Sequence, residues 1–151
     1  MTESNGYHKI LVATDFSPAS EPAILEATKL AHKDGAELLI AYACEPASPL
    51  LIDGYVVPWV YEEWDNTLRK AAEKALGPLV ETARKEGVNA RSVLLRGSPF
   101  QAIADAAGNE HADLVVMGTH GRTGFSRMVL GSVAARVAAS APCPVLTVRA
   151  A

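Results

Sequence analysis

The sequence predicts an α/β fold, one domain in which a five-stranded parallel sheet is covered by helices on both faces. Short apolar runs alternate with segments of helical periodicity along the chain. The runs are apolar at nearly every position, as in strands that are buried on both faces. Such alternation is typical of parallel sheets. The 151 residues suit one domain, 1–151, without internal repeats.

The first third of the chain predicts a β-α-β unit after a polar N-terminal tail, residues 1–8. Residues 9–14 are a compact apolar run and are expected to form the first strand. Ser17 is a suitable N-cap for the helix that follows, and Gly35 is a suitable stop for it. Residues 37–43 are the second strand.

Residues 45–61 form a variable loop that three interpretations fit. The segment contains three prolines and many apolar side chains, which suits a lid, a surface that binds a partner, or a loop packed on the domain. Of these, the packed loop is preferred.

The middle of the chain predicts a long helix, a third strand and a short helix. Apolar residues recur at helical spacing over 62–86, and Gly77-Pro78 is expected to bend or interrupt that helix. Residues 90–96 are the third strand. Ser98 to Gln101 has the pattern of a capping box with proline at the first helical position.

The fourth strand, 112–117, leads into a glycine-rich loop that is much longer than the usual connection of about 2–6 residues. A helix over 132–139 and a fifth strand over 143–149 complete the chain. Long glycine-rich loops at the end of a strand are often kept for binding, and glycines let backbone amides approach a ligand closely. The start of the following helix adds unpaired N–H groups, so the natural ligand is a phosphate.

Composition argues against several classes of partner. The formal charge of −3 gives no basic footprint for nucleic acid. The N-terminus does not resemble a signal peptide, and no apolar run approaches the ~20 residues that span a bilayer. We therefore expect a cytoplasmic protein with no membrane partner. Cys44 and Cys143 are expected to be buried and reduced, and the four histidines show no spacing typical of a metal site.

Two features fall at the carboxyl ends of predicted strands, where parallel sheets bind ligands. They are Thr14-Asp15 after the first strand and the glycine loop after the fourth. The loop lacks the closing Gly-Lys-Ser/Thr of a Walker A motif and the Gly-x-Gly-x-x-Gly of dinucleotide sites. We expect phosphate to be held by backbone N–H groups, with help from the Ser132 hydroxyl. The residues expected to supply these N–H groups are Gly118, Gly121, Gly131 and Ser132. The alternative is that the glycines only permit an irregular loop.

Individual side chains also have two interpretations. Asp15 either caps the turn that follows it or contacts the nucleotide and helps to place Mg²⁺. His120 invites a catalytic role, but a loop histidine without a visible nucleophile is more often structural. Arg122 and Arg127 either neutralise phosphate charge or remain solvated.

The spacing Gly118-x2-Gly121-x9-Gly131-Ser132 resembles the nucleotide-binding signature of the universal stress protein family. The resemblance extends over nearly the whole chain. Residues 10–17 resemble the first strand and turn of that family, 113–122 its fourth strand and loop, and 143–148 its closing strand.

This resemblance implies a strand order of 3-2-1-4-5 and, because the glycine signature is intact, membership of the subgroup that binds ATP. It also implies a homodimer joined through the C-terminal strand, 144–149. The family often has histidine and valine where this chain has Tyr42 and Ala43, which would alter the pocket wall. The binding residues that the resemblance implies, together with their neighbours at the strand ends, are Ala13, Thr14, Asp15, Ala43, Met117, Gly118, Gly121, Arg122, Gly131, Ser132 and Val133.

Three functions fit these observations. The first is an ATP-binding regulatory protein of the stress response whose nucleotide state changes its surface for a partner. The second is a slow ATPase or phosphotransferase that uses the same site, although phosphoryl transfer usually needs stronger charge stabilisation than a lysine-free loop offers. The third is a flavodoxin-like or receiver-type module; a receiver expects clustered acidic residues at the strand ends, and only Asp15 qualifies clearly.

Overall fold

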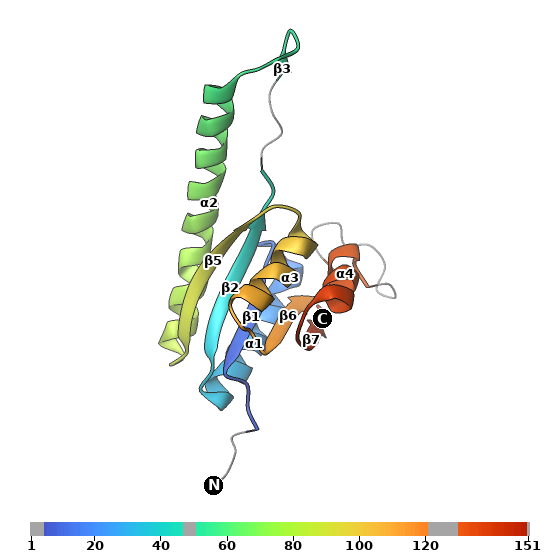
Figure 1. The fold of residues 1–151 in the computed structure, drawn as a ribbon. Helices are drawn as coiled ribbons and strands as arrows, with labels where there is room; N and C mark the ends of the chain where they lie inside the picture. The colour runs from blue at the N-terminus through green and yellow to red at the C-terminus, as the bar shows by residue number, and fades with distance from the viewer. Residues whose placement is uncertain (1–4, 47–50, 121–129, 151) are drawn as a thin grey trace.

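The computed structural model describes residues 5–46, 51–120 and 130–150. Strands and helices alternate through most of this length, as the apolar runs predict (Figure 1). The strands are β1 (Lys9–Ala13), β2 (Glu37–Cys44), β3 (Leu51–Ile52), β4 (Tyr55–Val56), β5 (Asn89–Arg96), β6 (Leu114–Gly118) and β7 (Val145–Val148). The helices are the 3-10 turn η1 (Pro18–Ser20), α1 (Glu21–Asp34), α2 (Pro58–Lys85), α3 (Pro99–Asn109) and α4 (Ser132–Ser140).

The main sheet has five parallel strands in the order β5-β2-β1-β6-β7. Counted along the main sheet alone, this is 3-2-1-4-5, so the expected order is confirmed. β1 pairs with β2 on one side and with β6 on the other, although β6 comes more than a hundred residues later. The strand order therefore reverses between β1 and β6, and the carboxyl ends of these two strands flank the position where open α/β sheets bind ligands.

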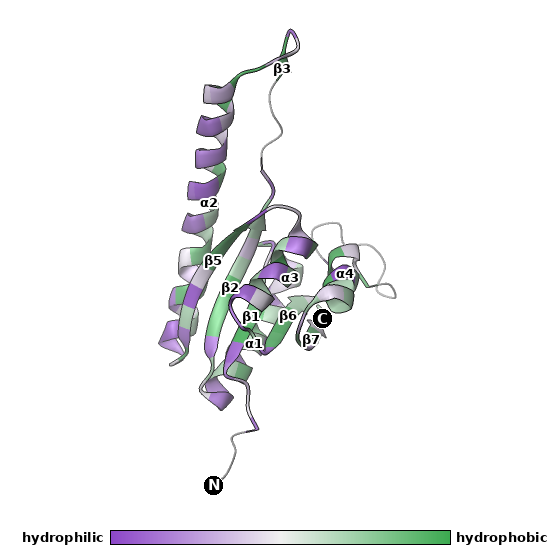
Figure 2. Ribbon diagram, viewed as in Figure 1, coloured by the Kyte–Doolittle hydropathy of each residue, from purple (hydrophilic) through white to green (hydrophobic). Residues whose placement is uncertain are grey.

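Helices cover both faces of the sheet, as expected. α1 and α2 pack on one face of the sheet and α3 and α4 pack on the other (Figure 1). The central strands are therefore buried on both faces. In β1, for example, Ile10 and Val12 face the first layer while Leu11 faces the second. Figure 2 shows the resulting contrast between the apolar strands and the polar outer side of α2. Burial on both faces explains why the strand segments are apolar throughout instead of alternating.

Some local predictions need correction. Ser98 and Ser17 stand at helix starts, but neither side chain makes the capping hydrogen bond, so the expected capping box is not formed. α1 begins only at Glu21, because a 3-10 turn precedes it. Pro78 does not interrupt α2, which continues through it as one helix of 28 residues. Gly35 ends α1 in the left-handed conformation, as predicted.

Residues 45–61 differ most from expectation, because the preferred packed loop is wrong. The described part of this segment forms the hairpin β3–β4 and then enters α2, whose first turns extend beyond the sheet (Figure 1). The side chains of β3 and β4 are all exposed. We call residues 51–65, the hairpin with the first two turns of α2, the arm.

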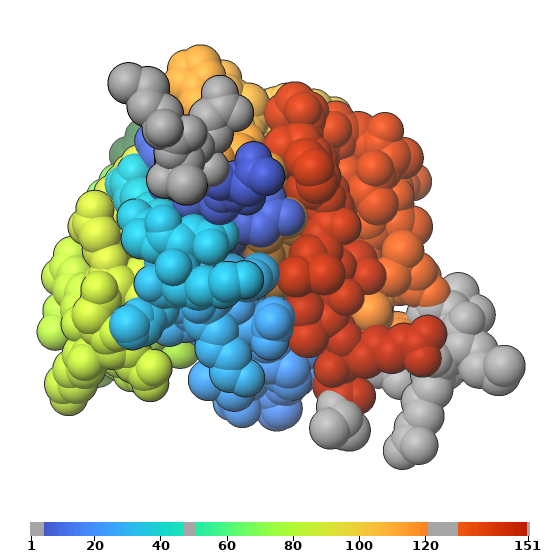
Figure 3. Space-filling view, turned by 90° about the horizontal axis from the view of Figure 1, so that it is seen from below, coloured from blue at the N-terminus to red at the C-terminus, as the bar shows by residue number. Residues whose placement is uncertain are grey.

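The chain before β1 is fixed to the body where the structure describes it. The Tyr7 N–H donates to the carboxylate of Asp34 (2.9 Å), and the His8 N–H donates to that of Asp113 (2.8 Å). At the other end of the chain, β7 is an edge strand. Seen from below, the C-terminal segment and the end of α2 lie on opposite sides of the molecule (Figure 3). Among the described helices, none is both long and apolar enough to cross a membrane.

Candidate functional site

A pocket of about 810 Å³ opens at the carboxyl ends of β1, β2 and β6. This size falls in the usual range for small-molecule sites, about 300–1,000 Å³. Nine of the eleven predicted site residues line the pocket, and the other two, Gly121 and Arg122, lie outside the described residues, as does Arg127. The nine are Ala13, Thr14, Asp15, Ala43, Met117, Gly118, Gly131, Ser132 and Val133.

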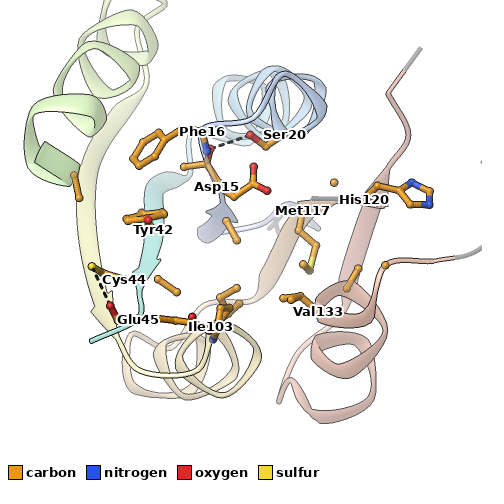
Figure 4. A pocket seen from close by; sticks show the side chains of 18 of the residues that line it. Asp15, Phe16, Ser20, Tyr42, Cys44, Glu45, Ile103, Met117, His120 and Val133 are labelled. Atoms are coloured by element: carbon orange, nitrogen blue, oxygen red, sulfur yellow. Dashed lines mark hydrogen bonds between the residues drawn. The ribbon is translucent and has the colours of Figure 1, made fainter. Parts of the chain in front are cut away.

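The turn after β1 is held by a network of hydroxyl groups. The Ser20 hydroxyl donates to the Ser17 carbonyl (2.8 Å), so the Thr14 hydroxyl donates to Ser20 Oγ (3.0 Å) while accepting from the Phe16 N–H (3.0 Å). The Asp15 carboxylate accepts from the Ser17 N–H (2.9 Å) and from the Ser17 hydroxyl. Asp15 therefore caps this turn while it faces the pocket, so the two interpretations of this residue are compatible (Figure 4).

Phe16 forms part of one wall in a backbone conformation that bulky residues rarely adopt. Its φ is +63°, in the left-handed region, where a bulky side chain is a genuine outlier. This turns the Phe16 ring onto Tyr42, with ring centroids 4.6 Å apart (Figure 4). Strain of this kind costs on the order of 1–3 kcal/mol and tends to cluster at functional sites.

Two glycines on the other wall are needed because backbone passes too close for a side chain. A Cβ at Gly118 would lie 3.0 Å from the carbonyl oxygen of Ala19, and one at Gly131 would lie 2.9 Å from that of Thr119. The ends of the glycine loop meet there, since the Gly131 N–H donates to the Thr119 carbonyl (2.7 Å). This bond corrects one expectation, because the Gly131 amide is already used and does not offer its proton to a phosphate.

Donors for an anion lie one residue further, at the start of α4. The first intrahelical bond runs from the Ala135 N–H to the Gly131 carbonyl (2.9 Å), so the amides of Ser132, Val133 and Ala134 have no partner within the helix. All three residues line the pocket. Their N–H groups and the positive end of the helix dipole favour a negative charge at this point.

Few charged side chains are available within the described lining. It contains the acidic Asp15 and Glu45, the imidazole of His120, and no lysine or arginine. The Thr119 hydroxyl and His120 Nδ1 are 3.0 Å apart. No group of three or more described His, Cys, Asp or Glu side chains is placed to hold a metal. Within the described part of the pocket, the negative charge of a phosphate would therefore be stabilised by main-chain dipoles.

Sequence reasoning missed the lining that α2 and α3 supply. The residues are Leu68, Ala71, Ala72, Ala75, Pro99 and Ile103. The spacing of those on α2 identifies a helix face that is covered, but a stripe that faces a pocket and a stripe that faces the core have the same period. The small size of the three alanines was the available signal. Cys44 also lines the pocket, and both cysteines are free thiols that are only partly buried. For Cys143, burial raises the pKa of the thiol.

Comparison with known proteins identifies the family. The profile of the universal stress protein family matches residues 6–149. A universal stress protein of Methanocaldococcus jannaschii, MJ0531, is 37% identical over 145 residues, which cover 96% of this chain and 84% of that relative. The chain belongs to the universal stress protein family.

Two solved universal stress proteins were determined as nucleotide complexes. One, in complex with cAMP, is 27% identical with a TM-score of 0.63, and the match covers 97% of this chain and 99% of that one. The other, from Archaeoglobus fulgidus in complex with dAMP, is 25% identical with a TM-score of 0.67, covering 95% and 98%. Both ligands contain adenine and phosphate, so relatives of this fold hold adenine nucleotides.

Proposed function

We propose that this universal stress protein binds ATP, together with Mg²⁺, in the pocket at the carboxyl ends of β1, β2 and β6, and that nucleotide occupancy regulates its contact with a protein partner. The observation that carries the proposal is the wall made by Gly118, Gly131 and the start of α4. There, the close approach of backbone forbids side chains, and three helix amides remain for phosphate oxygens. The dAMP and cAMP complexes of relatives support adenine as the base.

Each residue has a role in this proposal. The amides of Ser132 and Val133, with the Ser132 hydroxyl, hold the phosphates, and Gly121 and Arg122 act with them. Met117 and Gly118 line the ribose and phosphate side, while the backbone of Ala43 meets the adenine. Ala13 and Thr14 shape the floor of the pocket. The Asp15 carboxylate, which accepts a hydrogen bond from the Ser17 N–H, is the ligand for Mg²⁺. This ion is typically bound by one or two carboxylates and the substrate phosphates.

The test is the melting temperature with and without Mg-ATP. ATP at about a hundred times its Kd stabilises a folded protein by about 2.7 kcal/mol, which is roughly 5–10 °C for a chain of this size. We expect Gly131→Val to remove this shift, because the new Cβ would lie 2.9 Å from the Thr119 carbonyl oxygen and displace the start of α4. In the control Gly108→Ala the Cβ meets only Pro142, at 3.7 Å, and the shift should remain.

Ligand choice separates the alternatives. A shift with FMN and none with ATP would contradict the proposal in favour of a flavodoxin-like module. Phosphate release during the same incubation measures turnover. We expect it to be slow or absent, because the described lining holds no lysine or arginine to stabilise the charge of a transferring phosphoryl group.

The protein is also proposed to form a homodimer through residues 144–149. β7 is the last strand of the sheet and its residues are only partly buried. An edge strand of this kind tends to be paired or covered. The regulatory partner is a further protein, and neither nucleic acid nor a membrane is expected to bind.

A further inference from the structure

The pocket spans both faces of the sheet at its carboxyl edge. Ala13, Met117 and Val133, which the nucleotide proposal uses, belong to the layer between the sheet and the helices α3 and α4. Phe16 and Tyr42 belong instead to the layer on the side of α1 and α2. Figure 4 shows these two rings beside α2, with Met117 and Val133 on the other side of the pocket. The pocket therefore has a second half, in which the nucleotide proposal places no group.

The pleat of β2 explains this division. Successive residues of a strand point to opposite faces, so Tyr42 and Cys44 point towards α2 while Ala43, between them, points towards α3. α2 packs against β2 and β5, and its residues 68–75, which follow the arm, lie beside the pocket. We call this half of the pocket the side chamber. It is lined by Phe16, Tyr42, Leu68, Ala71, Ala72 and Ala75.

The side chamber is apolar. The Tyr42 hydroxyl is the only polar side-chain group among these six residues, and the neighbouring Cys44 adds a thiol. Ala71 and Ala75, one helical turn apart, are exposed, so α2 presents little bulk at this point. A phosphate or a sugar would lose its hydration here without gaining hydrogen bonds, whereas an apolar group gains free energy when it leaves water. The chamber therefore suits an uncharged apolar group.

The aromatic wall of the chamber is held in place against a conformational preference. Phe16 has a φ of +63°, and its N–H donates to the Thr14 hydroxyl (3.0 Å). Its ring lies 4.6 Å from that of Tyr42 between centroids, with the planes tilted by 40°. A bulky residue stays in the left-handed region only when the surrounding structure holds it there, and such residues cluster at ligand sites. The wall offers aromatic surface on which a further ring packs well.

The orientation of the nucleotide directs one edge of the base to this chamber. This step rests on the proposed function, in which the phosphates lie at the start of α4, the ribose lies beside Met117 and the adenine lies at the backbone of Ala43. Because the strand order is β5-β2-β1-β6-β7, the nucleotide then runs from β6 across β1 to β2. Adenine carries its ribose on N9 and its amino group, N6, on the opposite edge. N6 therefore points past β2, towards α2.

We propose that the side chamber binds an apolar group carried on N6 of an adenine nucleotide, so that the protein prefers N6-substituted adenine nucleotides to ATP. The phosphates remain at the start of α4, since the chamber has no charged side chain to hold them. The apolar group packs between the rings of Phe16 and Tyr42 and the alanine face of α2. The ligand class is thus an adenine nucleotide with a ring or a branched alkyl group on its amino nitrogen.

Isothermal titration with N6-benzyl-ATP and with ATP, each with Mg²⁺, tests this proposal. We expect N6-benzyl-ATP to bind about tenfold more tightly than ATP, because the benzyl ring leaves water for an apolar wall. N6-methyl-ATP is the matched ligand, since its substituent is too small to fill the chamber. It should bind with nearly the affinity of ATP.

Filling the chamber from α2 should remove the preference. Ala75→Leu places an apolar side chain where the benzyl ring is expected, so the ratio of the two affinities should fall from about ten to about one. Ala71→Leu, one turn earlier, should have the same effect and gives a second variant. Both alanines are exposed, so the fold has space for the larger side chain. Ala139→Leu is the matched control, because Ala139 is also an exposed helical alanine and lies outside the pocket, and it should keep the ratio.

The outcomes separate this proposal from the proposed function. If the protein binds ATP and binds N6-benzyl-ATP no more tightly, the side chamber has no such role and the ATP proposal stands. If it binds neither nucleotide, both proposals fail. A preference for N6-benzyl-ATP that survives in Ala71→Leu and in Ala75→Leu would place the benzyl ring outside the chamber and overturn the proposal.

Discussion

At the scale of single residues, the pocket depends on where the chain has no side chain. Gly118 ends β6 where the turn η1 crosses it, and a Cβ there would lie 3.0 Å from the Ala19 carbonyl oxygen and 3.4 Å from that of His120. Both contacts are with backbone, which cannot rotate away. The glycine therefore allows the turn after β1 and the loop after β6 to approach each other closely.

Gly118→Ala should accordingly destabilise the fold as well as the site. Overpacking of this kind costs about 1–3 kcal/mol. Gly108→Ala is a control at a helical glycine where a Cβ makes ordinary contact, and it should leave stability unchanged or raise it by up to about 1 kcal/mol. Urea denaturation of both variants measures the difference. Equal stability of the two would contradict the close approach of η1.

At the scale of secondary-structure elements, a chain of ion pairs joins the amino ends of three neighbouring strands. Glu37 of β2 accepts from Arg91 of β5 (2.7 Å) and contacts Lys9 of β1 (3.3 Å), and Arg91 also donates to Glu110 at the end of α3 (2.6 Å). The hydrogen bond from Arg91 is the main reason that the pKa of Glu37 lies below its usual value. The network links the aligned amino ends of β2 and of both its neighbours.

This lowered pKa predicts a pH dependence. A carboxyl whose folded pKa is depressed contributes stability that is present above its unfolded pKa and is lost as the pH falls through the folded value. The Arg91 side chain is 42% exposed, so solvent screens the pair, and Glu37→Gln should cost only about 0.5–1 kcal/mol at pH 7. The difference between the two proteins should shrink towards zero below about pH 4. Denaturation with urea at pH 7, 5 and 3.5 tests this, and a constant difference would contradict it.

The same elements show what could be predicted from sequence. The sheet could be predicted, because strands that are buried on both faces are apolar throughout, as Ile10, Leu11 and Val12 show. The position of the pocket could also be predicted, because Thr14-Asp15 and the glycine loop follow two strands that end at the same edge of the sheet. The extended hairpin could not be predicted, because apolar residues such as Leu51 and Tyr55 are normally expected to be buried in the core. The hydrogen bond from the Gly131 amide to the Thr119 carbonyl could not be predicted either, since it depends on how the two ends of the loop meet.

At the scale of the whole molecule, the free edge of β7 provides a test of assembly. The Val115 N–H donates to the Pro144 carbonyl (3.0 Å) and the Thr119 N–H donates to the Val148 carbonyl (3.1 Å). Alternation along the strand then directs the backbone groups of Leu146 towards β6 and those of Thr147 outward. The outward N–H of Thr147 is thus available to a second copy of β7.

Thr147→Pro should therefore separate the proposed dimer without unfolding the protomer. Proline is tolerated in an edge strand where its missing N–H would face outward, and it cannot donate across the two-fold axis. Leu146→Pro, one residue away, removes a bond to β6 and should lower the melting temperature sharply. Light scattering should give half the mass for Thr147→Pro, with the ATP-dependent shift in melting temperature retained because the pocket is formed within one chain. An unchanged mass for a folded Thr147→Pro variant would mean that the copies do not pair through β7.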